Sequence, residues 1–133
     1  MDRSWIFAGT VTRVVDADTF DINVDLGFDI SQDIRFRLTA DTVDFDAPET
    51  WRPKYKSERE HGEAATALVR DLIENKYVTI KSVRRGKYRY VAVIYVSING
   101  SDPVDLAQHL IVSGYQKFKE SVYIKLDKEI LDE

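Results

Sequence analysis

The sequence predicts a small α+β domain, mainly β, in which five strands form a Greek-key barrel with two to three helices packed on it. Three observations predict this class. Apolar and polar residues alternate along five short segments, and two further segments repeat their apolar residues at helical spacing. The order along the chain is three strands, a helix, two strands and a helix. With no linker or repeat, residues 1–133 are expected to form one domain with one core.

The first three strands are expected before residue 39. Residues 5–15 alternate loosely and are rich in Val, Ile and Thr, and the "DAD" that follows favours a turn. Strict alternation appears at 20–26 and again at 33–38, as it does in half-buried strands. In the last of these, Arg35 and Arg37 lie on the face opposite the apolar one.

The first helix is expected from about Ser57 to Asn75. Ser57 and Glu60 form a capping-box pattern, and apolar residues then recur at helical spacing. Two more strands are expected at 77–83 and 88–96, separated by the basic turn "RRGK".

The second helix is expected to begin with Asp102 as its N-cap and Pro103 at its first position, and to end before Gly114. The tail after Ser121 favours a third, short helix with Val122 on its apolar stripe. A barrel of short antiparallel strands, with the first helix between the third and fourth strands, is typical of the OB-fold.

The composition excludes several classes of protein. There are no cysteines, so disulfides, thiolate zinc sites and cysteine nucleophiles are ruled out, and only two histidines are present. No apolar run could span a bilayer, and the N-terminus lacks the features of a signal peptide. We therefore expect no membrane association and a cytoplasmic location.

The charges are unevenly distributed. The net charge of −4 argues against non-specific nucleic-acid binding, but residues 16–50 hold ten acids against two bases, whereas residues 81–90 hold five bases and no acid. One surface is therefore expected to favour a cation and another an anion. Domains that use a metal ion to act on phosphates need both.

Five stretches carry a resemblance to a known family. In order and spacing, "VTRVVDADTF", "RFRL", "DAPET", "GEAATALVRDLIENKYVTI" and "GKYRYVAVIYV" resemble the staphylococcal nuclease (thermonuclease) family over roughly residues 8–117. The resemblance implies an OB-fold nuclease. Hydrolysis of a phosphodiester requires a cation on the phosphate, a base for the water and cationic donors for the developing charge, and these motifs contain residues of each type.

The resemblance also implies a role for particular residues. Calcium ligands are expected from two carboxylates and one backbone carbonyl, supplied by Asp18, Asp46 and Ala47. The expected general base is Glu49, and the arginines expected on the phosphate are Arg37 and Arg89. The pair expected to hold the neighbouring phosphate and nucleotide is Lys87 and Tyr88. Hard oxygen ligands leave Mg²⁺ and Mn²⁺ open as alternatives to Ca²⁺.

Some alternatives stay open at this point. The stretch between Arg37 and Asp46 is longer than in the family, with "TADT" as the apparent insertion. The insertion brings Asp41 and Asp44 in as rival ligands and makes Arg35 a rival to Arg37. The family's glycine before the second arginine is missing from "KYRY", and its two tyrosines after the second helix have only loose counterparts. Those counterparts are Tyr115 and Tyr123.

The leading hypothesis is a Ca²⁺-dependent, largely sequence-nonspecific nuclease. By resemblance it hydrolyses DNA or RNA, single-stranded or locally unpaired, and leaves 3′-phosphates. A catalytically inactive domain of the same fold is the runner-up, binding single-stranded nucleic acid or a protein partner through its basic hairpin. A weaker third reading is a calcium-stabilised structural domain. A monomer is the default expectation.

Overall fold

The computed structural model describes residues 5–131, and the side chains of all of these residues except 82, 83, 130 and 131. The chain forms six strands and three helices within this range. In order these are β1 (Trp5–Asp16), β2 (Thr19–Asp25), β3 (Ser31–Leu38), α1 (Lys56–Ile73), β4 (Tyr77–Arg85), β5 (Tyr90–Val96), β6 (Val104–Asp105), α2 (Leu106–Val112) and α3 (Glu120–Leu131).

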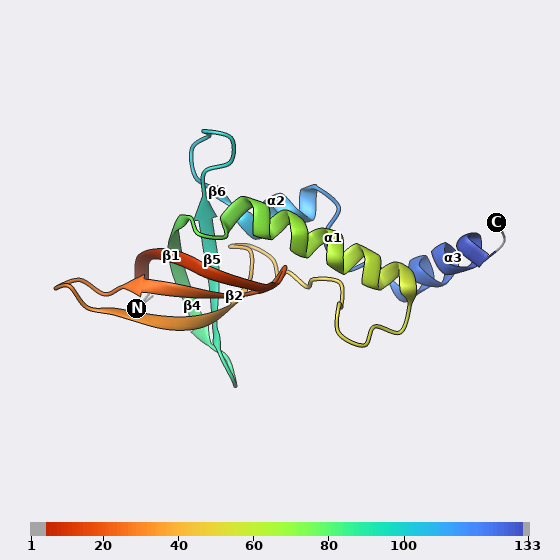
Figure 1. Cartoon of the computed structure of the whole chain (residues 1–133), viewed down its shortest axis with the longest axis horizontal. Coiled ribbons are helices and arrows are strands. Elements are labelled where there is room, and N and C mark those ends of the chain that lie inside the picture. Colours follow the sequence, from red (N-terminus) through yellow and green to blue (C-terminus); the bar gives the residue numbers. More distant parts are fainter. Residues whose placement is uncertain (1–4, 132–133) are drawn as a thin grey trace.

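Five of the strands close into a barrel, as the sequence predicts. β1 pairs antiparallel with both β2 and β4, β2 pairs with β3, and β4 pairs with β5. The barrel closes where β3 runs parallel to β5, with Phe36 opposite Tyr90 and Leu38 opposite Ala92. Figure 1 shows the curled sheet with the helices gathered at one end.

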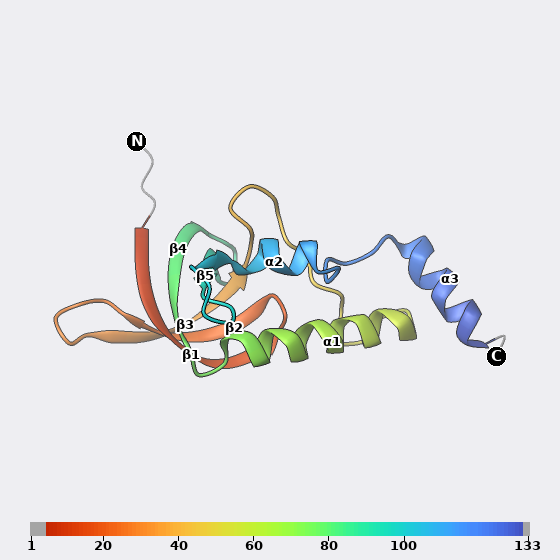
Figure 2. The same cartoon turned by 90° about the horizontal axis from the view of Figure 1, so that it is seen from above.

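The core lies inside the barrel and beneath α1. In β2 the alternate residues Phe20, Ile22 and Val24 are at most 2% exposed, which confirms the predicted period of two. On α1, Val69 and Ile73 are fully buried among the barrel residues. Figure 2 shows α1 running along the barrel and beyond it towards α3, so its first turns are free to contact other segments.

The start of the second helix differs from the prediction. α2 begins at Leu106, and its N-cap is Asp105, whose carboxylate accepts a hydrogen bond from the Gln108 N–H at 3.2 Å. Asp102 and Pro103 instead precede the short strand β6, which pairs with the end of β5 and which the sequence did not indicate. The predicted end is confirmed, because Gly114 follows the C-cap with a φ of 90°.

The predicted capping box of the first helix is wrong. The N-cap of α1 is Tyr55, which makes no side-chain cap hydrogen bond. The free N–H groups of Lys56 and Ser57 are satisfied from a distance, by the carboxylate of Asp127 on α3, at 3.2 and 2.9 Å. The other end agrees with the sequence, since Asn75 has a φ of 64° just after the helix.

The third helix is present, but a different residue anchors it. The predicted stripe is half exposed, with Val122 at 39%, whereas Tyr123 is only 1% exposed. The Tyr123 hydroxyl lies 2.8 Å from Nδ1 of His61 and accepts a hydrogen bond from the Phe118 N–H. α3 therefore packs through an aromatic and polar seam with α1.

Candidate active site

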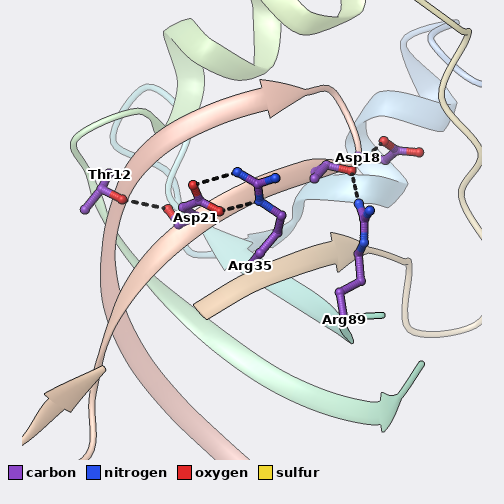
Figure 3. A network of polar contacts seen from close by, with 6 residues as sticks. Thr12, Asp18, Asp21, Arg35 and Arg89 are labelled. Atoms are coloured by element: carbon purple, nitrogen blue, oxygen red, sulfur yellow. Dashed lines mark hydrogen bonds and ion pairs between the residues drawn. The ribbon is translucent and has the colours of Figure 1, made fainter. Parts of the chain in front are cut away.

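Asp18 lies in the tight turn between β1 and β2 and is half-buried. Burial raises the pKa of this carboxyl. Hydrogen bonds from the Thr19 hydroxyl and the Ala47 N–H, together with the positive charge of Arg37, partly oppose the rise. The Thr19 hydroxyl also accepts a hydrogen bond from Arg89 at 3.0 Å. Asp18 and Arg89 thus lie at the two ends of one short polar chain (Figure 3).

The structure separates the two arginines of β3. Arg35 forms a two-pronged ion pair with Asp21, with contacts of 2.7 and 3.1 Å, on the outer face of the barrel (Figure 3). Arg37 lies opposite Thr19 in the β2–β3 register, and its charge acts on Asp18. The geometry thus brings Arg37, and not Arg35, to the Asp18 carboxylate.

The acid loop, residues 44–50, is held on the N-terminal half of α1. Phe45, Ala47 and Pro48 are buried, which leaves Asp46 and Glu49 to face solvent. The loop backbone passes so close to Gly62 that a Cβ there would lie 2.7 Å from the Pro48 carbonyl oxygen. Only glycine leaves room for this approach.

Residues 116 and 117, in the segment after α2, hydrogen-bond to the acid loop. The N–H of Lys117 donates to the Asp46 carbonyl at 2.8 Å, and the Asp46 N–H donates to the Gln116 side chain at 3.1 Å. Both backbone groups of Asp46 are therefore fixed, and its carboxylate is presented from a rigid support. Nothing in the spacing of the sequence signalled this contact.

Glu49 stands among several charges. Partial burial raises the pKa of its carboxyl; the positive charge of Lys117 opposes this shift, while the charges of Asp18, Asp46 and Glu58 add to it. These groups are thus close enough to influence one another. The structure brings together carboxylates from the β1–β2 turn and from the acid loop, as the motif spacing predicts.

Lys117 is a member of this cluster that sequence reasoning missed. Its ammonium lies 3.3 Å from the carboxylate of Glu58, whose side chain is only 6% exposed. Glu58 sits in the first turn of α1 and its negative charge needs a partner at that depth. A buried glutamate near a helix start gives no signal in a single sequence.

The two rival ligands point elsewhere. Asp41 accepts a hydrogen bond from Lys81 at 2.9 Å, and its own N–H donates to Asp105. The Asp44 carboxylate lies 3.4 Å from the Thr39 hydroxyl, at the base of the inserted loop. The insertion bulges outward, as the gold loop in Figure 2 shows. Asp46, which follows the insertion, is close enough for its charge to act on Glu49.

Lys87 and Tyr88 stay apart from the cluster. They form the exposed tip of the β4–β5 hairpin, with the Lys87 ammonium 5.2 Å from the centre of the Tyr88 ring. Among the described contacts, none ties either side chain to Asp18 or Glu49. The tip leads directly into Arg89. A nucleic-acid strand bound at this arginine would therefore pass close to Lys87 and Tyr88.

The two tyrosine candidates pack against His61, although the charges of Glu58, Lys117 and Asp46 also reach Tyr123. Tyr123 is buried in the seam with α1, and the Tyr115 ring packs against His61 with ring centres 6.1 Å apart. His61 also places Nε2 2.8 Å from the Gly114 carbonyl oxygen, and its other nitrogen meets Tyr123. These tyrosines hold helices together.

The donor chemistry of the cluster fits a hard divalent cation. Asp18, Asp46 and the Ala47 carbonyl offer three oxygen ligands, and water would supply the rest of the six to eight that Ca²⁺ takes. A cation would also relieve the cost of the charge on the half-buried Asp18. Within residues 5–131, no three His, Cys, Asp or Glu side chains are grouped tightly enough to hold a metal by themselves.

The fold and the cluster together define an OB-fold domain that carries acids and arginines at one end of its barrel. Residues 39–132 match the family described as staphylococcal nuclease homologue, and the protein belongs to this family. The match begins after Asp18 and Arg37, so their place beside the acid loop rests on the structure. No curated protein matched the sequence. Each helix within residues 5–131 is too short or too polar to cross a membrane.

Proposed function

We propose that the protein is a Ca²⁺-dependent nuclease that hydrolyses phosphodiester bonds in DNA or RNA with little regard to sequence. One observation carries the proposal. Asp18, from the first turn, and the acid loop, from the middle of the chain, converge with Arg37 and Arg89 at one end of the barrel. Family membership supports the reaction class.

In this proposal the arginines bind the scissile phosphate. A guanidinium donates two parallel hydrogen bonds to phosphate oxygens and stays charged at any physiological pH. Arg37 lies half-buried on β3, and Arg89 is held by Thr19 at the start of β5. Arg89 is thus held before the substrate arrives, which is the condition for stabilising charge that develops in the transition state.

Glu49 acts as the general base in the same proposal. It takes a proton from a water molecule whose oxygen forms a bond to phosphorus, while the bond from phosphorus to the 5′-oxygen breaks and that oxygen takes a proton from solvent. The products carry a 3′-phosphate and a 5′-hydroxyl. A carboxyl pKa raised by partial burial supports this role, because a stronger base accepts the proton more readily.

Asp18, Asp46 and the Ala47 carbonyl are the proposed calcium ligands. Bound calcium would supply Lewis-acid stabilisation of the phosphate and lower the pKa of a bound water. The grip of Gln116 and Lys117 on Asp46 supports the site, since it fixes the loop that offers two of the ligands. Lys87 and Tyr88 would contact the neighbouring phosphate and nucleotide from the hairpin.

A second candidate function is binding of single-stranded nucleic acid without cleavage. Lys117 already places a positive charge among the acids, and Tyr88 is 80% exposed at a basic hairpin tip, where a base could stack. In that case calcium has no effect on the protein.

The test is cleavage of an end-labelled single-stranded DNA in millimolar calcium and in excess chelator. Glu49→Gln is the catalytic variant, and Glu63→Gln, an exposed residue of α1, is its matched control. We expect calcium-dependent cleavage by the wild type and Glu63→Gln but not by Glu49→Gln. The melting temperature of each should still rise with calcium. DNA binding without cleavage by the wild type would select the second candidate.

A further inference from the structure

The β2–β3 hairpin carries an apolar tip that nothing in the described structure covers. Phe28 is 97% exposed, and its neighbours Leu26 and Ile30 are 39% and 57% exposed. Figure 1 shows the hairpin projecting from the barrel at the end opposite α3. A phenyl ring with almost no protein contact forgoes the stabilisation that burial of an aromatic side chain provides.

The backbone of this tip is in a conformation that a phenylalanine disfavours. Phe28 and Asp29 have φ angles of 54° and 60°, and the turn is closed by a hydrogen bond from the Ile30 N–H to the Gly27 carbonyl. Two-residue turns with positive φ favour Asn, Asp and Gly, and a bulky residue there is strained. Strain of this kind clusters at sites of recognition.

A hollow that fits such a ring opens at the same end of the barrel. Its volume is about 380 Å³, and its lining, drawn from all five barrel strands or their ends, includes Trp5, Phe7, Leu26, Ile34 and Tyr90. A cavity of about 150 Å³ is enough to hold benzene. Phe28 does not enter the hollow of its own chain, since its side chain is almost fully exposed.

The hollow opens because two strands run past their partners. Among the described pairings, residues 5–7 of β1 pair only with β4, and residues 31–35 of β3 pair only with β2. The apolar interior of the barrel is therefore accessible between them. Trp5, at this opening, is 60% exposed.

The charges beside the tip are opposite to the charge beside one wall of the hollow. Asp29 stands beside Phe28, with the exposed Asp25 and Asp33 on the same hairpin. On the hollow side, the guanidinium of Arg85 lies 4.7 Å from the centre of the Tyr90 ring, which forms part of the wall. The acids around the tip repel phosphates, so a nucleic acid or an anionic membrane is a poor occupant.

We propose that two copies of this chain associate through this end, each inserting Phe28 into the hollow of the other. A two-fold axis makes the exchange reciprocal, because a tip and a hollow lie side by side on each copy. Asp29 of each copy then faces Arg85 of the other, and this pair selects the orientation. The association uses none of the residues proposed for catalysis or calcium binding, although Arg85 shares the β4–β5 hairpin with Lys87 and Tyr88.

The test is the molar mass in solution, measured by sedimentation equilibrium over a range of protein concentrations. We expect a concentration-dependent dimer for the wild type and a monomer for Phe28→Ser. Val112→Ser, which removes another exposed apolar side chain, on α2, is the matched control and should dimerise like the wild type. Because Phe28 and Val112 are exposed, neither change should disturb the fold.

Charge reversal tests the pairing itself. Asp29→Arg and Arg85→Asp should each weaken association by about tenfold, and the double variant should restore it. In a Trp51→Phe background the emission of Trp5 should shift to shorter wavelength as the dimer forms. A wild type that stays monomeric at every concentration would overturn the proposal, as would a dimer that Phe28→Ser leaves unchanged.

Discussion

The two ends of the barrel differ in whether their energetically costly groups have partners within the chain. At the acidic end, buried or crowded charges are each met by a neighbour: Thr19 for Asp18, Lys117 for Glu58, Gln116 for the Asp46 backbone. At the open end, a strained phenylalanine and an apolar hollow are left to solvent. The acidic end is held in place by contacts within the chain, as the proposed calcium site requires, whereas the open end would be completed only in the proposed dimer.

The sharpest way to test the acidic end is to compare its arginines. Arg89→Ala should lower kcat/KM by about 10²- to 10³-fold, because it removes a phosphate donor. Arg35→Ala should change it by less than about threefold, since Arg35 is occupied by Asp21 on the outer face. The measurement is the rate of DNA cleavage in calcium. Equal losses in the two variants would mean that the β3 register at the site is misassigned.

The next effect concerns stability. Lys117→Met leaves the buried Glu58 carboxylate without its ammonium and should lower the free energy of unfolding by about 2–4 kcal/mol. Lys119→Met, on an exposed neighbour, is the control and should change it by less than about 0.5 kcal/mol. Denaturant unfolding measures both. Adding Glu58→Gln to Lys117→Met should recover part of the lost stability. No recovery would mean that the two residues do not stabilise each other.

A smaller change of opposite sign is expected at Asp18. Burial raises the pKa of its carboxyl, so the ionised form costs stability at neutral pH, and that cost is removed as pH falls through the folded pKa. Asp18→Asn should therefore raise the free energy of unfolding without calcium by roughly 1 kcal/mol. The variant should also lose the rise in melting temperature with calcium. A destabilised Asp18→Asn would show that the carboxylate is held by more than the described contacts.

The smallest effect lies at the α1–α3 junction. The nearby Ser57 side chain and hydrogen bonds from the N–H groups of Ser57 and Lys56 hold the pKa of Asp127 below its ordinary value. A depressed carboxyl pKa stabilises the fold above the unfolded value, about 3.9, and the contribution is lost as pH falls through the folded pKa. Protection of the Ser57 amide from hydrogen exchange should thus decline in acid. In Asp127→Asn, protection should be lower at neutral pH and should change less with pH.

The alternation of apolar and polar residues in β2 and β3 predicted these strands of the barrel. A strand with one buried face shows this two-residue period in a single sequence. The same local logic predicted the end of α1 at Asn75 and of α2 at Gly114, where a positive φ is needed. It failed at the starts of both helices. The groups that cap α1 come from Asp127, 70 residues away, and no local pattern reports so distant a partner.

The sequence indicated the residue types of the candidate site but not the contacts that hold them in place. The motifs predicted that Asp18 and the acid loop lie together. The structure adds that Arg37, and not Arg35, acts on Asp18, and that Asp41 contacts Lys81 instead. Lys117 was invisible beforehand, since a lysine after a helix is usually a solvated surface residue. The burial of Tyr123, which sequence spacing left as a loose counterpart of a family tyrosine, could not be predicted because it depends on His61, 62 residues away.

The cap that Asp127 places on α1 has a consequence for biosynthesis. As the chain leaves the ribosome, the barrel strands and α1 emerge well before residue 127, so the first turn of α1 must wait with its amide groups unsatisfied. The acid loop rests on that same half of α1, at Gly62, and is gripped by residues 116 and 117, which also emerge late. We therefore expect a nascent chain to assemble most of its barrel before its acidic end becomes ordered.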